Sequence, residues 1–133
     1  MNWYLKVLKQ YLDFSGRARR KEYWFFTLFH IIFYGVCMLL DKILGTSAGE
    51  GGIGFLYLTY FLLTLIPSFA LSIRRMHDIG KSGWMVLVSI IPIAGPIWFL
   101  VLTCMESEMK TNQWGDNPKG IGNDGLINQI GTE

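Results

Sequence analysis

Charged residues are scarce in this sequence of 133 residues, and the scarcity is local. Lysine, arginine, aspartate and glutamate together make up 17% of the chain, below the roughly 25% usual for a soluble domain. None of them occurs in residues 23–40, 51–73 or 82–105, stretches of 18, 23 and 24 residues. A membrane-spanning helix needs about 20 apolar residues. This distribution excludes an ordinary soluble enzyme domain, a disordered chain and a secreted disulfide-rich module.

Residue types that carry out chemistry are also few. The two cysteines and two histidines form no metal-binding motif, and no pair of carboxylates is present. His77-Asp78 could supply a base with an orienting carboxylate, but adjacent side chains rarely point at one another. The sequence therefore favours a non-enzymatic protein without metal or cofactor. Its net charge of +2 is too small to indicate a nucleic-acid-binding protein.

The uncharged stretches predict an all-α, polytopic membrane protein with three transmembrane helices, at about residues 23–44, 53–73 and 84–105. Pro67 is expected to kink the second helix, and Pro92 and Pro96 are expected to break the third, because proline removes a backbone donor. The first stretch begins only after residue 22 and is too long for a signal-peptide core. We therefore expect it to remain in the mature protein.

The two ends of the chain differ from this membrane domain, which covers residues 1–105. Residues 3–14 predict an amphipathic helix, with aromatic and aliphatic side chains on one face and lysines on the other. Such a helix suits a membrane surface, and it can equally pack on the protein's own spans. Residues 106–133 are polar and rich in glycine and asparagine. We expect them to form a mobile tail, apart from a turn at Asp116-Asn117-Pro118.

The distribution of basic residues predicts an orientation. Six precede the first span, three lie in loop 74–83, two lie in the tail, and Lys42 lies at the far end of the first span. With three crossings, nine face one side and three the other, so the N-terminus and loop 74–83 are cytoplasmic and the tail is outside. If 84–105 is instead a re-entrant hairpin, the division becomes eleven against one. We favour three crossings, because irregular backbone at membrane depth needs a protein shell that two spans scarcely supply.

Basic residues beside the apolar stretches are the most concentrated chemical signal. Clustered lysines and arginines attract anionic headgroups, and arginine binds phosphate bidentately. The same charges can also serve only to fix the orientation. We predict a cytoplasmic face that binds anionic lipid or a protein partner. Its candidate residues are Arg17, Arg19, Arg20, Lys21, Trp24, Arg74, Arg75, His77, Asp78, Lys81 and Trp84.

Two other functions are compatible with these residues. His30 is the one ionisable side chain well inside the first span, and such groups are functional candidates, although most hydrogen-bond to a neighbouring helix. The alternative function is therefore a small transporter or channel subunit acting as a homo-oligomer, with His30 and the proline-broken third span along the path. The third function is an enzyme that acts on a lipid headgroup through His77 and Asp78.

Three motifs resemble a known family, the domain of unknown function 805. They are Phe14-Ser15-Gly16-Arg17-Ala18-Arg19-Arg20-Lys21-Glu22-Tyr23-Trp24, Arg74-Arg75-Met76-His77-Asp78-Ile79-Gly80-Lys81-Ser82-Gly83-Trp84 and Asn112-Gln113-Trp114-Gly115-Asp116-Asn117-Pro118-Lys119. Trp114 stands where tyrosine or phenylalanine is commoner, and Ile79 where a small polar residue is frequent. The resemblance covers about residues 3–120. It implies a small polytopic protein of the bacterial inner membrane and no particular activity, and it favours a single site formed by the two arginine-rich motifs.

Overall fold

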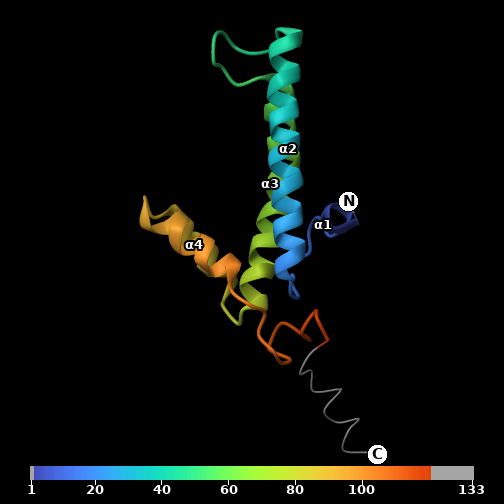
Figure 1. The fold of residues 1–133 in the computed structure, drawn as a ribbon, viewed down its shortest axis with the longest axis vertical. Coiled ribbons are helices and arrows are strands. Elements are labelled where there is room, and N and C mark those ends of the chain that lie inside the picture. Colours follow the sequence, from blue (N-terminus) through green and yellow to red (C-terminus); the bar gives the residue numbers. More distant parts are fainter. Residues whose placement is uncertain (1, 121–133) are drawn as a thin grey trace, which may run out of the picture.

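Two long helices form the body of the protein in the computed structural model, which describes residues 2–120. Helices α2 (Arg20–Leu44) and α3 (Phe55–Asp78) lie antiparallel and side by side (Figure 1), and no β-strand occurs among the described residues. Both are long and apolar enough to cross a membrane. At about 1.5 Å per residue each is roughly 36 Å long, compared with about 30 Å of hydrocarbon core. They correspond to the first two predicted spans.

The junction between these helices is fixed by a carboxylate. Helix α2 ends at Gly45, whose φ of 67° is the left-handed conformation that glycine adopts at helix ends. Asp41 is buried, and its carboxylate accepts hydrogen bonds from the backbone nitrogens of Leu56 at 2.9 Å and Tyr57 at 2.8 Å. These are among the donors that the first turn of α3 leaves without an intrahelical partner. Asp41 thus caps α3 from the neighbouring helix.

Residues 83–104 form a hairpin, in place of the single third helix that the sequence favoured. Its arms are a 3₁₀-helix, η1 (Gly83–Ile90), and an α-helix, α4 (Ala94–Cys104). Arg20, at the start of α2, donates a hydrogen bond to the carbonyl of Cys104 at 3.3 Å, so the second arm returns to the end where the first begins. At about 2.0 Å per residue for the 3₁₀-helix and 1.5 Å for the α-helix, each arm is roughly 16 Å long. The hairpin thus has the form of the re-entrant alternative.

The reversal has a local cause at the tip of the hairpin. Ile93 has φ 66° and ψ −64°, and the Ala94 nitrogen donates to the Pro92 carbonyl at 2.7 Å, which defines a γ-turn. A Cβ atom at Gly95 would lie 2.2 Å from the Val88 carbonyl oxygen, so only glycine lets the two arms approach this closely. Proline and glycine together therefore reverse the chain where the favoured prediction was a broken helix and the re-entrant hairpin was the alternative.

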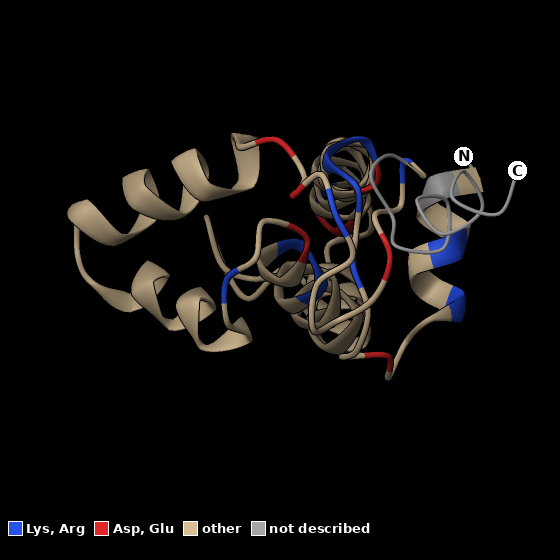
Figure 2. Ribbon diagram, turned by 90° about the horizontal axis from the view of Figure 1, so that it is seen from below, with Lys and Arg blue, Asp and Glu red and all other residues tan. Residues whose placement is uncertain are grey.

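Helix α1 (Asn2–Lys9) is shorter than the predicted helix at 3–14, because the chain turns after it, with the Asp13 nitrogen bonded to the Gln10 carbonyl at 3.1 Å. Tyr4 is buried, and its ring stacks on Phe26 of α2 with a centroid separation of 5.1 Å. The helix therefore packs on the protein's own spans, one of the two arrangements left open by the sequence. Seen from the end of the helix pair, α1 and the hairpin lie on opposite sides of α2 and α3 (Figure 2).

Residues 106–120 do not form the free tail that the sequence predicted. They fold against the ends of α2 and α3, where Ser107 and Asn117 are buried. These residues are held in place because an arginine side chain donates hydrogen bonds to their backbone carbonyls. The amino-acid composition of the segment does not predict such bonds. The turn at Asp116-Asn117-Pro118 is confirmed, since the Lys119 nitrogen donates to the Asn117 side chain at 2.8 Å. The rest of the predicted tail, 121–133, lies outside the described residues.

Candidate functional site

The Asp78 cluster, formed by Arg17, Arg75, Asp78 and Ser107, lies where α3 ends. Arg75 and Asp78 share one face of the last turn of α3, being three residues apart, and Arg17 comes from the segment before α2. Asp78 Oδ1 accepts from Arg17 Nε at 3.1 Å, and Oδ2 accepts from Arg75 Nη1 at 2.5 Å and from the Ser107 hydroxyl. The side chains of both arginines and of Asp78 are at most 1% exposed.

The remaining donors of these arginines bind the chain that follows α4. Arg17 donates to the carbonyls of Glu108 at 2.5 Å and Lys110 at 2.6 Å, and Arg75 donates to the carbonyls of Thr103 at 3.1 Å and Met105. A guanidinium has five N–H donors, so these bonds occupy most of both groups. The cluster therefore holds residues 103–110 against the two long helices.

A second charged cluster lies beside the first and holds α1. Glu22 is in the first turn of α2, where the helix dipole favours negative charge. Its carboxylate is 2.9 Å from Lys6 Nζ and 3.6 Å from Arg74 Nη1, and Arg74 also donates to the Gln10 side chain. Both Glu22 and Arg74 are buried. These contacts connect α1 and the residue after it to both long helices.

His77 and Asp78 do not face each other. The Nδ1 atom of His77 lies 3.1 Å from the Gly16 carbonyl, and the ring stacks on Trp114 at 4.5 Å with an interplanar angle of 7°. The Asp78 carboxylate is occupied by the two arginines and Ser107. The base with an orienting carboxylate that the sequence suggested is therefore not assembled in this geometry.

The structure brings the two arginine-rich motifs together, since the Ala18 nitrogen donates to the Arg74 carbonyl at 3.1 Å. It does not bring all their charges to the surface. Arg17, Arg74, Arg75, His77 and Asp78 are buried, Arg19 and Trp24 are half-buried, and Arg20, Lys21, Lys81 and Trp84 are exposed. The candidate set thus divides into an internal network and an exposed rim.

The exposed rim carries mostly positive charge. Arg20 and Lys119 both pair with Glu106, at 2.8 and 2.6 Å, and the hydrogen bond from Lys119 holds the pKa of the Glu106 carboxyl below its ordinary value. Lys21 and Lys81 are exposed and form no ion pair among residues 2–120. These two ammonium groups are the best placed of the candidate residues to meet an external anion.

Sequence reasoning missed several residues of this region. Asn112 donates from its side chain to the His77 carbonyl at 2.9 Å, and Asn117 donates to the Glu108 carbonyl at 3.2 Å. The missed set is Lys6, Gln10, Glu22, Ser107, Asn112, Trp114 and Asn117. A usable signal existed for four of them, because Glu22 belongs to the first family-like motif and Asn112, Trp114 and Asn117 belong to the third.

His30 is hydrogen-bonded between the helices. Its Nδ1 atom lies 3.0 Å from the Tyr60 hydroxyl on α3, which is 2.8 Å from the Tyr4 hydroxyl on α1. The preferred interpretation of His30, as a hydrogen-bonding partner of a neighbouring helix, is confirmed. Within residues 2–120, no three His, Cys, Asp or Glu side chains are grouped so that they could hold a metal ion.

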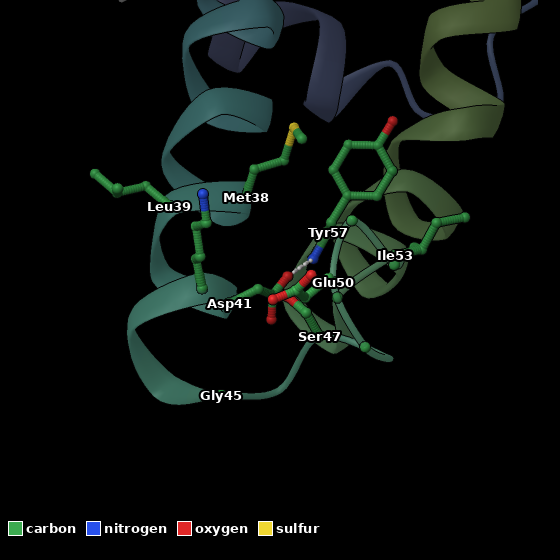
Figure 3. Close-up of a pocket in the computed structure, with 13 residues that line it drawn as sticks. Met38, Leu39, Asp41, Gly45, Ser47, Glu50, Ile53 and Tyr57 are labelled. Carbon is green, nitrogen blue, oxygen red and sulfur yellow. Dashed lines mark hydrogen bonds between the residues drawn. The ribbon is translucent and has the colours of Figure 1, made fainter.

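The opposite end of the helix pair has a cavity of about 750 Å³ under the loop 45–54. Figure 3 shows Met38, Leu39 and Tyr57 on its walls and Asp41 directed toward the backbone of Tyr57. Both oxygens of Asp41 are used in capping α3, and Thr46 also donates to Oδ1 at 2.5 Å. The carboxylate at this end therefore has a structural role.

Comparison with known proteins finds a family and relatives named as inner membrane proteins. The family described as "Protein of unknown function (DUF805)" matches residues 11–116. The chain is 46% identical to the inner membrane protein YhaH of Escherichia coli K12, over 90% of this chain and 98% of that protein. It is 43% identical to the inner membrane protein YhaI of the same strain, over 90% of this chain and 97% of that protein. No solved structure matches the chain.

Proposed function

The chain belongs to the DUF805 family, whose relatives YhaH and YhaI are inner membrane proteins, and on this basis we propose that it is a multi-pass inner membrane protein that binds anionic phospholipid at its cytoplasmic end. The proposed binding surface is the exposed rim of the candidate set. It consists of Arg20, Lys21, Lys81, Trp84 and the half-buried Trp24.

The observation that carries this proposal is the position of Lys21 and Lys81 beside apolar surface. Lys21 is the second residue of α2, two residues before the uncharged stretch 23–40, and Lys81 lies directly before the uncharged stretch that contains η1. Trp84 is 78% exposed, and exposed tryptophans beside lysine are typical of the headgroup region, where the indole ring is half in lipid and half in water. A basic residue near an anionic membrane surface contributes about 1 kcal/mol to the attraction.

The proposed orientation follows from the hairpin and the charges. Because both ends of the hairpin lie at the end where α2 begins and α3 ends, residues 105–120 lie on the same side as residues 10–19. This arrangement has two crossings and places eleven basic residues on one side and Lys42 on the other. That division agrees with the positive-inside rule better than nine against three.

A reporter that works only in the cytoplasm is expected to be active when fused after Glu133 of the full chain. A reporter that works only in the periplasm is expected to be active when inserted at Ser47. The physical reason is that the hairpin arms, each roughly 16 Å long, span about half of the hydrocarbon core. Paired alkaline phosphatase and fluorescent-protein fusions measure the two locations. A periplasmic C-terminus would contradict the two-crossing orientation.

Lys21→Gln and Lys81→Gln are each expected to weaken retention of phosphatidylglycerol about fivefold at low salt, the equivalent of about 1 kcal/mol. Retention is measured by native mass spectrometry of protein exchanged into mixed phosphatidylglycerol and phosphatidylcholine. Lys42→Gln is the matched control, because it removes the same charge from an exposed residue at the opposite end of the helix pair. Equal retention in all three variants and the wild type would overturn the proposed function.

A further inference from the structure

A groove of about 400 Å³ runs between α3 and η1, and its walls change character along its length. Phe69, Ile73 and His77 line it from α3 at four-residue spacing, so they form one stripe down that helix. Leu87 faces them from η1. The stripe begins inside the uncharged stretch and ends at the charged end of the helix pair. The groove therefore leads from apolar depth toward the headgroup region.

Polar groups gather where the groove reaches that end. His77, Ser82, Trp84 and Trp114 line the groove there. The Ser82 hydroxyl oxygen accepts from the Trp84 backbone nitrogen at 3.4 Å, which leaves the hydroxyl hydrogen to be donated. Lys81 precedes Ser82 and is exposed without an ion pair among residues 2–120. This end of the groove thus offers the Ser82 hydroxyl as a donor, and the nearest positive charge in the chain is that of Lys81, which adjoins Ser82 and is not itself a lining residue.

The tautomer of His77 adds a further requirement. A carbonyl oxygen can only accept a hydrogen bond, so the contact of Nδ1 with Gly16 at 3.1 Å places the ring proton on Nδ1. In the neutral ring, Nε2 is then an acceptor, and it has no hydrogen-bond partner among residues 2–120. A ligand that satisfies this atom must itself carry a donor, such as a hydroxyl group.

We propose that this groove is a binding site for one phospholipid with a phosphoglycerol headgroup. An acyl chain lies along Phe69, Ile73 and Leu87, the phosphate meets Lys81 and the Ser82 hydroxyl, and a glycerol hydroxyl donates to His77 Nε2. The site deepens the proposed function and rests on it, because it supplies the particular place and headgroup for an anionic lipid. Charge complementarity at Lys81 and the acceptor at His77 distinguish it from an unselective apolar surface.

The first test fills the groove. Leu87→Trp is expected to reduce the tightly retained phosphatidylglycerol at least about tenfold in native mass spectrometry, since the larger ring takes the volume of the acyl chain. Leu100→Trp is the matched control, because Leu100 is a similarly exposed leucine on α4 outside the groove. It is expected to retain the lipid within about twofold of the wild type, as an exposed apolar side chain makes little specific contact.

The second test separates the headgroup from the charge. Phosphatidylmethanol has the same single negative charge as phosphatidylglycerol and no hydroxyl group. The wild type is expected to prefer phosphatidylglycerol about fivefold, the effect of one hydrogen bond. His77→Asn can keep the bond to Gly16 through its amide N–H while it removes the Nε2 acceptor. It is expected to abolish that preference without changing the preference for anionic over zwitterionic lipid.

The outcomes distinguish this site from the proposed function. If Leu87→Trp binds as the wild type does while Lys81→Gln does not, anionic lipid binds outside the groove; the site is then rejected and the proposed function stands. Equal binding of the two anionic lipids by the wild type also rejects the site. If the wild type shows no preference for anionic over zwitterionic lipid, both proposals fail.

Discussion

Asp78→Ala is expected to destabilise the protein by about 3–5 kcal/mol, the usual effect of removing one partner of a buried ion pair. The variant would leave the guanidinium groups of Arg17 and Arg75 buried with no carboxylate, because both now bind Asp78. It would also remove the acceptor of the Ser107 hydroxyl. Equilibrium unfolding in detergent micelles measures the change in the free energy of unfolding.

Two further variants make this prediction specific. Asp78→Ala combined with Arg75→Met is expected to be more stable than Asp78→Ala alone, because an apolar side chain replaces one of the uncompensated charges. Glu50→Gln is the control, since Glu50 is exposed in the loop at the other end of the helix pair and lies outside both charged clusters. A loss below about 1 kcal/mol for Asp78→Ala would show that the arginines are not held by this carboxylate.

Asp41→Ala is expected to lower the Tm by about 5–10 °C, as the loss of a helix cap does in a domain of this size. The backbone nitrogens of Leu56 and Tyr57 would lose their acceptor, and the alanine methyl group cannot replace it. Asp41→Asn, which keeps one carbonyl oxygen, is expected to lose about half as much. Thermal unfolding followed by circular dichroism measures both.

The neighbouring residue supplies the control for this cap. Lys42→Gln changes an exposed side chain on the same turn and is expected to leave the Tm within about 1 °C. Because Asp41 and Asp78 lie at opposite ends of the helix pair, their effects are expected to add within about 0.5 kcal/mol. Strong non-additivity would contradict the view that the two carboxylates hold separate junctions.

The two long helices were predictable, because an uncharged stretch of about 20 apolar residues usually forms a membrane-spanning helix. The hairpin was harder to predict from the same information. Pro92 and Pro96 indicate that the helix is broken, but a broken helix can either cross the membrane with a kink or reverse its direction. The decision depends on Gly95, whose missing side chain lets the Val88 carbonyl approach. Such a contact depends on three-dimensional placement that periodicity does not contain.

The charged residues illustrate a different limit of sequence reasoning. The family resemblance favoured a single site formed by the two arginine-rich motifs, and the fold brings these motifs into contact. The sequence could not distinguish buried from exposed arginines. Arg75 and Lys81 look equivalent as positive charges beside an apolar stretch. Arg75 can be buried because the carbonyls of Thr103 and Met105 accept hydrogen bonds from its guanidinium group. Every residue has a backbone carbonyl, so the sequence does not show which carbonyls will do this. Only the folded path of residues 103–110 reveals which guanidinium groups they bind.

The reversal at Ile93 also gives the molecule an uneven cross-section. In the proposed orientation, and for residues 2–120, the cytoplasmic half of the bilayer contains parts of α2 and α3 together with η1 and α4, whereas the helices of the outer half are α2 and α3 alone. Each copy therefore displaces more lipid from the inner leaflet than from the outer one. Many copies in one membrane would create an area difference between leaflets, which lipids must balance by redistribution or by bending.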